Sequence, residues 1–416
     1  MKRKILAVVA FALANPIFAQ FSGDGYYRIK NKGEAHRYIS IVNDRVDDTN
    51  KKVDVTSTSS FVDIQVYALS TVKNPITDPG SILYITGTKM GNDYQVSIQA
   101  QGVSTEKLTK DQKLQVINQN YLYAEYKGVS LYLSDTYESF LKDLDMNACI
   151  ISGKRQRNDA KEYATWDIIK VDNTSEFIGV KPEITVGEKK YATLYTSFAY
   201  ELSDGLKAYY IDKHKYENVA EPIAEMKEIS KIVPASTPVI IECDSDDPLE
   251  NKIIPLLTDA APASIQGNEL KGNYFCYVKM AGDKENEEPT LGAQLKNVVN
   301  YDADTMRVLG IANGKLALVP ANDDQLVVTN KGKYLPANKA YITISQSESE
   351  VTAKGISVLS PEDYEIAATS IKSALYNQPN NKQGVYTLEG IKVSENTFDG
   401  LPKGIYISNN KKVVVK

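Results

Sequence analysis

The residues best suited to acid–base or nucleophilic chemistry in this chain are its two histidines, because the imidazole ring titrates near neutral pH. They are His36, beside Arg37, and His214, which lies between two lysines. Two histidines far apart in the sequence make no His-rich metal site and disfavour a Ser–His–Asp or Cys–His centre. We predict both to be solvated surface residues. The sequence also lacks a P-loop, a Cys-x-x-Cys pair and a glycine-rich dinucleotide fingerprint, so we expect no cofactor.

Carboxylates are abundant, and the densest acidic stretch runs from Glu242 to Glu250. Counted from Asp244, an EF-hand calcium loop would need Gly at the sixth position and Glu at the twelfth, where the sequence has Leu249 and Pro255. We therefore predict a solvated acidic loop and no metal, with an irregular calcium site as the alternative. Two carboxylates suffice for glycoside hydrolysis, but nothing singles out a pair among 53 acidic residues. We identify no catalytic residue, and a non-catalytic protein is favoured over an enzyme.

The numbers of cysteines and tyrosines indicate which bonds and which kind of secondary structure surround these residues. An odd number of cysteines, Cys149, Cys243 and Cys276, excludes complete pairing within one chain. Two alternatives remain open for Cys243 and Cys276: a disulfide that joins them, or two buried thiols. Tyrosine is common, with 27 residues against 9 Phe and one Trp, which favours half-buried faces of β-strands. Exposed tyrosine platforms for stacking on a sugar or a partner are the alternative.

Residues 1–19 have the pattern of a secretory signal, with the charged start Lys2-Arg3-Lys4, an apolar run from Ile5 to Ala14 and a small residue at Ala19. We expect export to the periplasm, the cell surface or the medium. No later apolar run is long enough for a transmembrane helix. Removing the signal leaves 45 basic against 53 acidic residues, a formal charge of −8, which disfavours nucleic acid as a partner.

Residues 20–175 are predicted to form a β domain built from three pairs of strands. The pairs are Gly25–Asn31 with His36–Val42, Ser81–Gly87 with Tyr94–Gln99, and Asn120–Tyr126 with Val129–Ser134. The opening segment and the closing strand at Trp166 resemble ricin-type β-trefoil lectin domains. The resemblance implies a β-trefoil-like fold for this domain. It does not extend to the family's sugar site, because Trp166 is the only tryptophan and no Gln-x-Trp motif exists; we expect Trp166 in the core.

Residues 180–346 are predicted to form an antiparallel β-sandwich of short strands separated by Gly, Pro, Asn and Asp turns. The expected strands are Tyr191–Tyr200, Lys207–Asp212, Pro238–Cys243, Tyr274–Val278, Arg307–Ile311, Lys315–Val319, Leu326–Val328 and Ala340–Ser345. Asn313-Gly314 is the strongest hairpin signal in the chain. Lys231–Ala235 and Lys333–Ala337 are two similar Pro-Ala turns, each leading into a strand. The domain resembles uncharacterised β-sandwich modules of exported proteins from Gram-negative anaerobes, a family without assigned chemistry.

Residues 347–383 read as a polar linker, with Ser360-Pro361-Glu362-Asp363 beginning a short helix that extends to Leu375. Residues 384–416 follow as a small β unit, with turns predicted at Gly390 and Gly404. This unit resembles the C-terminal half of the sorting domain of type IX secretion cargo, which implies the secretion machinery as a partner. The alternative is a capping hairpin without sorting activity. The matching residues are Tyr386, Gly390, Val393, Leu401, Gly404, Tyr406, Lys412 and Lys416.

Together these patterns predict an exported, all-β protein with a β-trefoil-like first domain, a β-sandwich middle domain and a small C-terminal unit. The function expected is non-catalytic binding or adhesion at the cell envelope, with a glycan as the ligand. A structural or assembly component of a surface structure is the alternative, and a glycan-acting enzyme is a weaker one. A surface protein is the other partner that the sequence allows.

Overall fold

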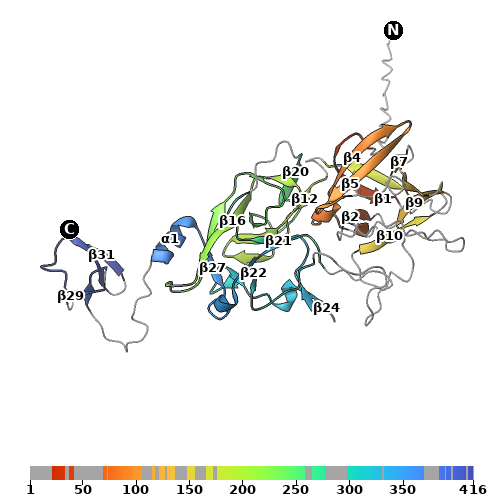
Figure 1. Ribbon diagram of the computed structural model, residues 1–416. Helices are drawn as coiled ribbons and strands as arrows, with labels where there is room; N and C mark the ends of the chain where they lie inside the picture. Colours follow the sequence, from red (N-terminus) through yellow and green to blue (C-terminus); the bar gives the residue numbers. More distant parts are fainter. Residues whose placement is uncertain are drawn as a thin grey trace, which may run out of the picture. The chain divides into compact units, whose positions relative to one another are not determined.

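β-Strands dominate the computed structural model, which confirms the predicted all-β class. The structure describes residues 21–32, 37–41, 69–72, 74–104, 115–117, 121–126, 129–135, 148–154, 165–171, 176–257, 265–276, 298–329, 332–369, 384–388, 390–394, 397–408 and 411–415. The chain divides into two compact units, 1–369 and 370–416, here called the body and the C-terminal unit (Figure 1). Among the described residues, no helix is long and apolar enough to cross a membrane.

The first sheet takes all of its described strands from the start of the chain. Its order is β11 (Trp166–Lys170), β1 (Gly25–Asn31), β2 (Tyr38–Ile41), β3 (Leu69–Val72), β10 (Ala148–Lys154), β9 (Val129–Asp135), β8 (Tyr121–Tyr126), β7 (Gln115–Ile117), β5 (Asp93–Ala100) and β4 (Leu83–Met90), with β6 (Val103–Ser104) beside β5. A 3-10 helix, η2 (Pro79–Ser81), precedes β4.

The three predicted strand pairs are confirmed as β1 with β2, β4 with β5, and β8 with β9. The first strand also pairs with the last, in a register from Tyr27↔Lys170 to Asn31↔Trp166. A further pairing of β1 with β4 closes the sheet into a ring of hydrogen-bonded strands. Trp166 is completely buried, as predicted for a core residue.

Two more sheets follow in the body. The smaller has the order β12 (Ile178–Gly179), β20 (Lys252–Leu256), β15 (Ala199–Leu202) and β18 (Ile232–Val233). The larger has the order β13 (Ile184–Val186), β14 (Lys189–Leu194), β19 (Val239–Cys243), β16 (Leu206–Lys215), β17 (Ile223–Glu228), β27 (Ile356–Leu359), β23 (Lys315–Val319), β22 (Met306–Ala312), β26 (Lys339–Thr343) and β21 (Lys271–Asn273). Outside them lie η8 (Asp323–Gln325), η9 (Gln346–Glu348) and the hairpin of β24 (Val327–Thr329) and β25 (Gly332–Tyr334).

Strand β19 shows how the cores of the body form, because its side chains alternate between two apolar clusters. Val239, Ile241 and Cys243 point into the cluster shared with the small sheet. Ile240 points into a second cluster, made where the two halves of the large sheet face each other. A strand covered on both faces needs apolar side chains that point both ways, which explains the run Val239-Ile240-Ile241. Glu242 is the polar exception in this strand, and its carboxylate is paired with Lys189.

Two predicted strands differ from the structure. Tyr191–Tyr200 is two strands, β14 and β15, in different sheets; the chain turns between them, where Thr196 Oγ1 donates to the Phe198 carbonyl at 2.8 Å. Tyr274–Val278 does not begin a strand. Instead β21 ends at Asn273, whose side-chain oxygen accepts from the Phe275 amide at 3.2 Å and so turns the backbone out of the sheet. Residues 277–278 lie outside the described part.

The turns predicted in the middle domain, at Asn313-Gly314 and at the two Pro-Ala units, are confirmed. Asn313 and Gly314 join β22 to β23 with φ values of 50° and 73°, the left-handed pair of a tight hairpin. In each Pro-Ala unit the second residue after proline is also left-handed, with φ of 56° at Ser236 and 60° at Asn338. The two units therefore share a local conformation, and each leads into a strand of the large sheet, β19 or β26.

The predicted boundary at 175–180 coincides with the change from the first sheet to the others. Contacts nevertheless cross it. The buried guanidinium of Arg28 lies 2.7 Å from a Glu176 carboxylate oxygen and donates to the Phe177 carbonyl at 2.7 Å. Ile82 also belongs to the same apolar cluster as Ile178. Two separate cores on either side of this boundary therefore stay a prediction.

The stretch predicted as a linker is partly folded. β27 pairs with β17 in parallel and with β23 in antiparallel fashion. Helix α1 (Pro361–Thr369) starts as predicted, with the Asp363 amide donating to Ser360 Oγ at 3.2 Å. The rest of the predicted helix, to Leu375, lies outside the described residues.

The C-terminal unit is a sheet with the order β29 (Lys392–Ser394), β28 (Val385–Tyr386), β30 (Gly404–Ser408) and β31 (Lys411–Val415). Gly390 has the left-handed conformation expected of a turn, with φ of 82°. Gly404 does not; it begins β30, and the left-handed glycine of that turn is Gly400, with φ of 81°.

Candidate functional site

A polar groove of about 470 Å³ lies on the first sheet, along β4 and β5. Its lining residues come from three consecutive cross-strand pairs and from the turn before β1. The pairs are Thr86↔Ser97, Gly87↔Val96 and Thr88↔Gln95, and the turn residue is Asp24. Directly opposed residues of an antiparallel pair share a face. The first and third pairs therefore place four hydrogen-bonding side chains on one face of the hairpin.

The middle pair anchors this groove to the core. Val96 is buried, and Gly87 lies against the ring of Phe21, where a Cβ would come within 2.5 Å of a ring carbon. The Gly87 amide donates to Asp24 Oδ1 at 3.0 Å, which fixes the turn before β1 beside the hairpin. Phe21 in turn packs edge-on against Tyr94 at 5.1 Å between ring centroids. The groove thus rests on a rigid aromatic base.

The lining chemistry suits binding more than catalysis. Hydroxyl groups and an amide can each donate and accept, as a neutral, polyhydroxylated ligand requires. Asp24 is the one ionisable side chain among the described lining residues, and one of its oxygens already accepts a backbone hydrogen bond. Glycoside hydrolysis needs two carboxyl groups, one on each side of the scissile bond. The described lining of the groove provides one carboxyl group, that of Asp24.

Two smaller hollows lie elsewhere in the body. One, of about 280 Å³, has an apolar floor and a rim in which Lys339 Nζ lies 2.7 Å from Glu183 Oε1. The other, of about 300 Å³, lies beside β15 and β16, where Lys231 is close to Asp204 and Lys207 is close to Glu228. In both hollows the cations of the lining are paired with carboxylates of the same lining.

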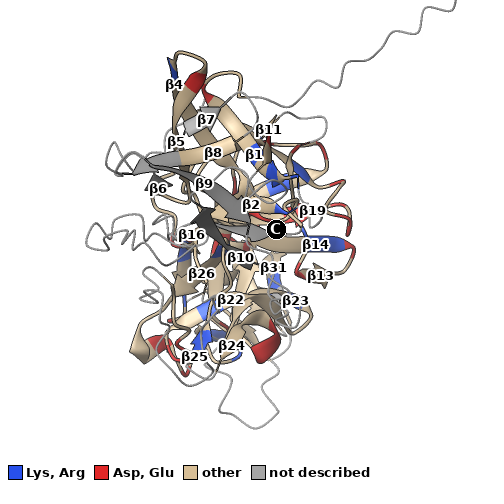
Figure 2. Cartoon of the chain, turned by 90° about the vertical axis from the view of Figure 1, so that its right-hand side faces the viewer, with Lys and Arg blue, Asp and Glu red and all other residues tan. Residues whose placement is uncertain are grey.

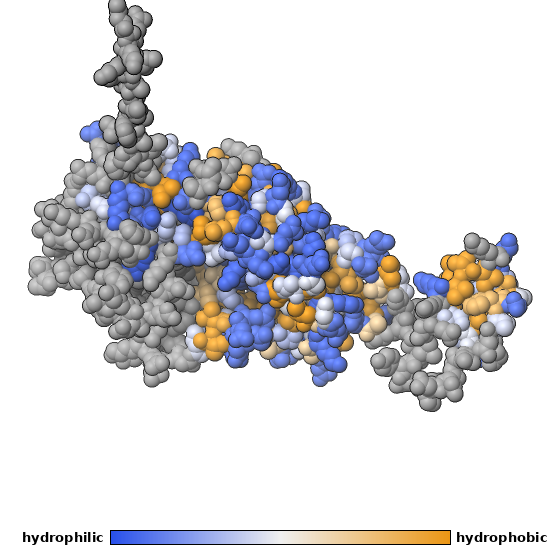
Figure 3. Space-filling view, turned by 180° about the vertical axis from the view of Figure 1, so that it is seen from behind, coloured by the Kyte–Doolittle hydropathy of each residue, from blue (hydrophilic) through white to orange (hydrophobic). Residues whose placement is uncertain are grey.

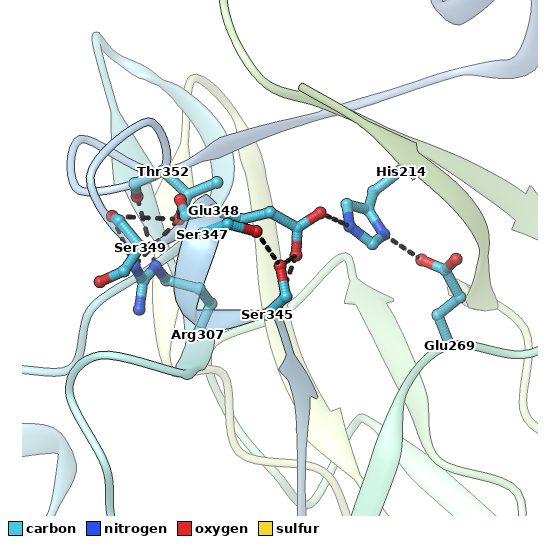
Figure 4. A network of polar contacts seen from close by, with 8 residues as sticks. All are labelled: His214, Glu269, Arg307, Ser345, Ser347, Glu348, Ser349 and Thr352. Carbon is cyan, nitrogen blue, oxygen red and sulfur yellow. Dashed lines mark hydrogen bonds and ion pairs between the residues drawn. The ribbon is translucent and has the colours of Figure 1, made fainter. Parts of the chain in front are cut away.

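His214 occupies the centre of a polar network in the body, and not the solvated position predicted for it (Figure 4). Its side chain is 18% exposed; Nδ1 lies 2.7 Å from Glu269 Oε2, and Nε2 lies 3.2 Å from Glu348 Oε1. The hydrogen bond to Glu269 raises the pKa of the ring, against the opposing effect of burial. A charged imidazolium donates from both nitrogens, which matches a carboxylate on each side.

The network continues from Glu348 to Arg307. Glu348 Oε2 accepts from the Ser345 amide at 2.6 Å and from its hydroxyl at 2.9 Å, which caps η9. Thr352 Oγ1 donates to the Glu348 carbonyl at 2.8 Å and accepts from Arg307 Nη2 at 2.9 Å. Because both ring nitrogens of His214 are engaged, the arrangement suits a structural tie between β16 and η9, with neither nitrogen left to take a substrate proton or a metal.

The acidic stretch divides at Cys243. Asp244, Asp247 and Glu250 are exposed, as predicted for a solvated loop, and Figure 2 shows acidic residues in the loops beside β14 and β19. Glu242 is instead buried, 3.2 Å from the hydroxyl of Tyr209 and 2.7 Å from Lys189 Nζ. Among the described residues, no group of three or more His, Cys, Asp or Glu side chains could hold a metal ion.

Cys243 and Cys276 are buried thiols and are not joined to each other, which decides between the two alternatives open in the sequence. Burial raises the pKa of the Cys243 thiol to about 12. A thiol with so high a pKa holds almost no thiolate at neutral pH and is unreactive.

The residues on which the expected resemblance to a sorting domain rests lie in the C-terminal unit. Tyr386 is in β28, Val393 in β29 and Gly404 in β30. Tyr406 is buried, and its hydroxyl donates to the Pro402 carbonyl at 2.8 Å. The remaining described matches are Gly390 and Leu401 in the turns and Lys412 in β31, and Lys416 lies outside the described residues. The motif is therefore spread over the whole small sheet.

Comparison with known proteins adds no relative: the chain matches no family model, no curated protein and no solved structure.

Sequence reasoning missed the groove residues. The signal was present, because the hairpin of β4 and β5 was predicted and its polar residues alternate with apolar ones. What the sequence lacked was the register that sets Thr86 beside Ser97 and Thr88 beside Gln95.

Proposed function

We propose that this protein is an exported, non-catalytic binding protein of the cell envelope, and that it recognises a glycan through the groove on β4 and β5. The observation that carries the proposal is the pair of polar cross-strand rows, Thr86 with Ser97 and Thr88 with Gln95, in a groove of about 470 Å³. Such a surface offers many hydrogen bonds from a rigid base and only one carboxylate. It can therefore orient sugar hydroxyls without supplying an acid and a base.

The finer fold assignment belongs to the same proposal. A β-trefoil-like first domain is supported by the three strand pairs and by the pairing of the first strand, β1, with the last, β11. A β-sandwich for the middle domain is supported by the apolar cluster between the small sheet and β14, β16 and β19.

Export is proposed on sequence grounds, from the signal pattern of residues 1–19 and the resemblance of 384–416 to a type IX sorting domain. In this proposal the C-terminal unit directs delivery or attachment to the surface and takes no part in ligand binding. The C-terminal residues form a compact unit of their own, which is consistent with that division of roles.

Glycan-array binding followed by titration calorimetry tests the function. Replacing Gln95 with Ala removes an amide from the groove, and we expect affinity for the best array ligand to fall about tenfold, equivalent to about 1.4 kcal/mol. Gln99→Ala is the matched control, because Gln99 is exposed on the same strand but outside the groove, and it should keep affinity within about twofold of the parent.

Three results would count against the proposal. They are an array without any binding, a loss in Gln99→Ala equal to that in Gln95→Ala, and cleavage of the bound glycan by the purified protein. The last result would restore the enzyme alternative.

A further inference from the structure

The C-terminal unit differs in charge from the rest of the chain. Residues 370–416 contain seven lysines, no arginine and three acidic residues, a formal charge of +4. The body, residues 1–369, then holds 41 of the 48 basic and 50 of the 53 acidic residues, a formal charge of −9. Opposite net charge in two units of one chain lets the basic unit attract an acidic surface.

The register of the small sheet arranges part of this charge around an apolar centre. Tyr386 pairs with Lys392 on one side and with Ile407 on the other, and Ile407 pairs with Lys412. Opposed residues share a face, so the four side chains form one row across all four strands. Three strand spacings separate the two lysines, about 14 Å. We call this surface, with Ile405 and Val414 beside the row, the lysine-flanked face.

Two apolar side chains of this face, Ile405 and Val414, are exposed, whereas Tyr386 and Ile407 in the row are half-buried. Ile405 and Val414 are opposite each other on β30 and β31, and they are 48% and 63% exposed. The small core of the unit is on the other face, where Val385 and Tyr406 are buried. Ile405 therefore faces away from this core, and its neighbour Tyr406 takes the inner position. Figure 3 shows apolar side chains gathered at the surface of this unit.

We propose that the lysine-flanked face docks on the acidic body of a second copy of this chain. Its apolar centre supplies area to bury, and a lysine at each edge of the sheet meets the negative charge of the body. Such a contact joins two different surfaces, C-terminal unit to body, and is therefore head-to-tail; repetition gives rings or chains. This inference is independent of the groove on β4 and β5 and does not need a glycan.

Sedimentation velocity of the full chain without residues 1–19 tests the proposal. We expect concentration-dependent association at low salt that weakens as salt is raised, because exposed charges are screened beyond about 10 Å at 0.1 M. Lys412→Glu reverses a charge on the face and should weaken association at least tenfold. Lys403→Glu changes the net charge equally, from an exposed position before β30 outside the paired row, and should weaken it less than threefold. Val414→Ser should also weaken it, without any change of charge.

Circular dichroism and a melting curve confirm that each variant is folded. Monomers at all concentrations and salts would overturn the proposal. Equal effects of Lys412→Glu and Lys403→Glu would also overturn it, because net charge alone would then explain the association. Binding to vesicles of phosphatidylglycerol that Lys412→Glu abolishes, with no self-association, would assign the face to an anionic membrane and would equally reject a second copy as the occupant.

Discussion

A carboxylate lies on each side of His214, and this placement decides what the ring can do. Glu269 is reached through Nδ1 and Glu348 through Nε2, while Tyr216 stacks near the ring at 6.4 Å between centroids. Lys213, the neighbour of His214, pairs instead with Glu225 and Glu365. When the ring is protonated it can donate to both carboxylates and tie β16 to η9, so its contribution to stability depends on pH.

The first prediction concerns this pH dependence. The pKa of His214 is raised in the folded protein, so its stabilisation is complete below the unfolded value of about 6.5 and is lost as pH rises through the higher folded value. Burial raises the pKa of Glu348, but hydrogen bonds from Ser345 and His214 lower it overall. Its contribution is therefore present above about pH 4.3 and lost as pH falls through the lower folded value. His214→Gln should then destabilise most near pH 5–6, by about 1–2 kcal/mol, and less above pH 8.

Urea unfolding of the parent and the variant at pH 5.5, 7 and 8.5 measures this difference. Lys207→Gln, which removes the exposed pair with Glu228, is the control and should cost less than about 1 kcal/mol at every pH. A cost of His214→Gln that grows with pH would contradict the charged tie.

At the scale of elements, turns were easier to predict from the sequence than sheet membership. The turn at Asn313-Gly314 was predictable because few residues adopt positive φ without strain, so an Asn-Gly pair is by itself a strong signal for a tight hairpin turn. The division of Tyr191–Tyr200 into the two strands β14 and β15 was not predictable from the sequence. Both halves are apolar, and only their different partners, β19 and β20, separate them. The groove was missed for the same reason, since register is a long-range property.

The second prediction concerns this hairpin. A Cβ on Gly314 would meet nothing within 4 Å, so Gly314→Ala tests the backbone alone. Its φ of 73° costs a residue with a Cβ about 1–2 kcal/mol, and the free energy of unfolding should fall by that amount. Gly25→Ala is the control, because Gly25 lies in β1 without a positive φ and its Cβ would be 3.6 Å from the nearest atoms. Urea unfolding should show little or no loss there, and equal losses at the two positions would contradict the backbone explanation.

At the scale of the whole molecule, the chain forms two compact units, the body and the C-terminal unit. The apolar clusters of the described body are made of residues up to Ala368. Val385 and Tyr406 are the buried apolar residues described in the C-terminal unit. The sequence predicted such a unit from its glycine turns and short strands, although it placed the preceding linker too early, because β27 is a short strand that only its partners β17 and β23 identify.

The last prediction follows from this division. A chain that ends at Thr369 keeps every described core residue of the body, so its melting temperature should stay within about 2 °C of that of the full chain. A loss of 1 kcal/mol in the free energy of unfolding would already lower the melting temperature of a large domain by about 2 °C or more. Calorimetry is run at a concentration where both proteins are monomeric, so that association does not add to the stability of the longer chain. Glycan affinity should also be unchanged, since the groove lies on β4 and β5.

A chain shortened further, to end at Gly355 or earlier, would lose β27 from between β17 and β23 and should melt much lower. If removal of 370–416 alone lowers the melting temperature by more than about 5 °C, the body depends on the C-terminal unit, and the separation of the two units is wrong.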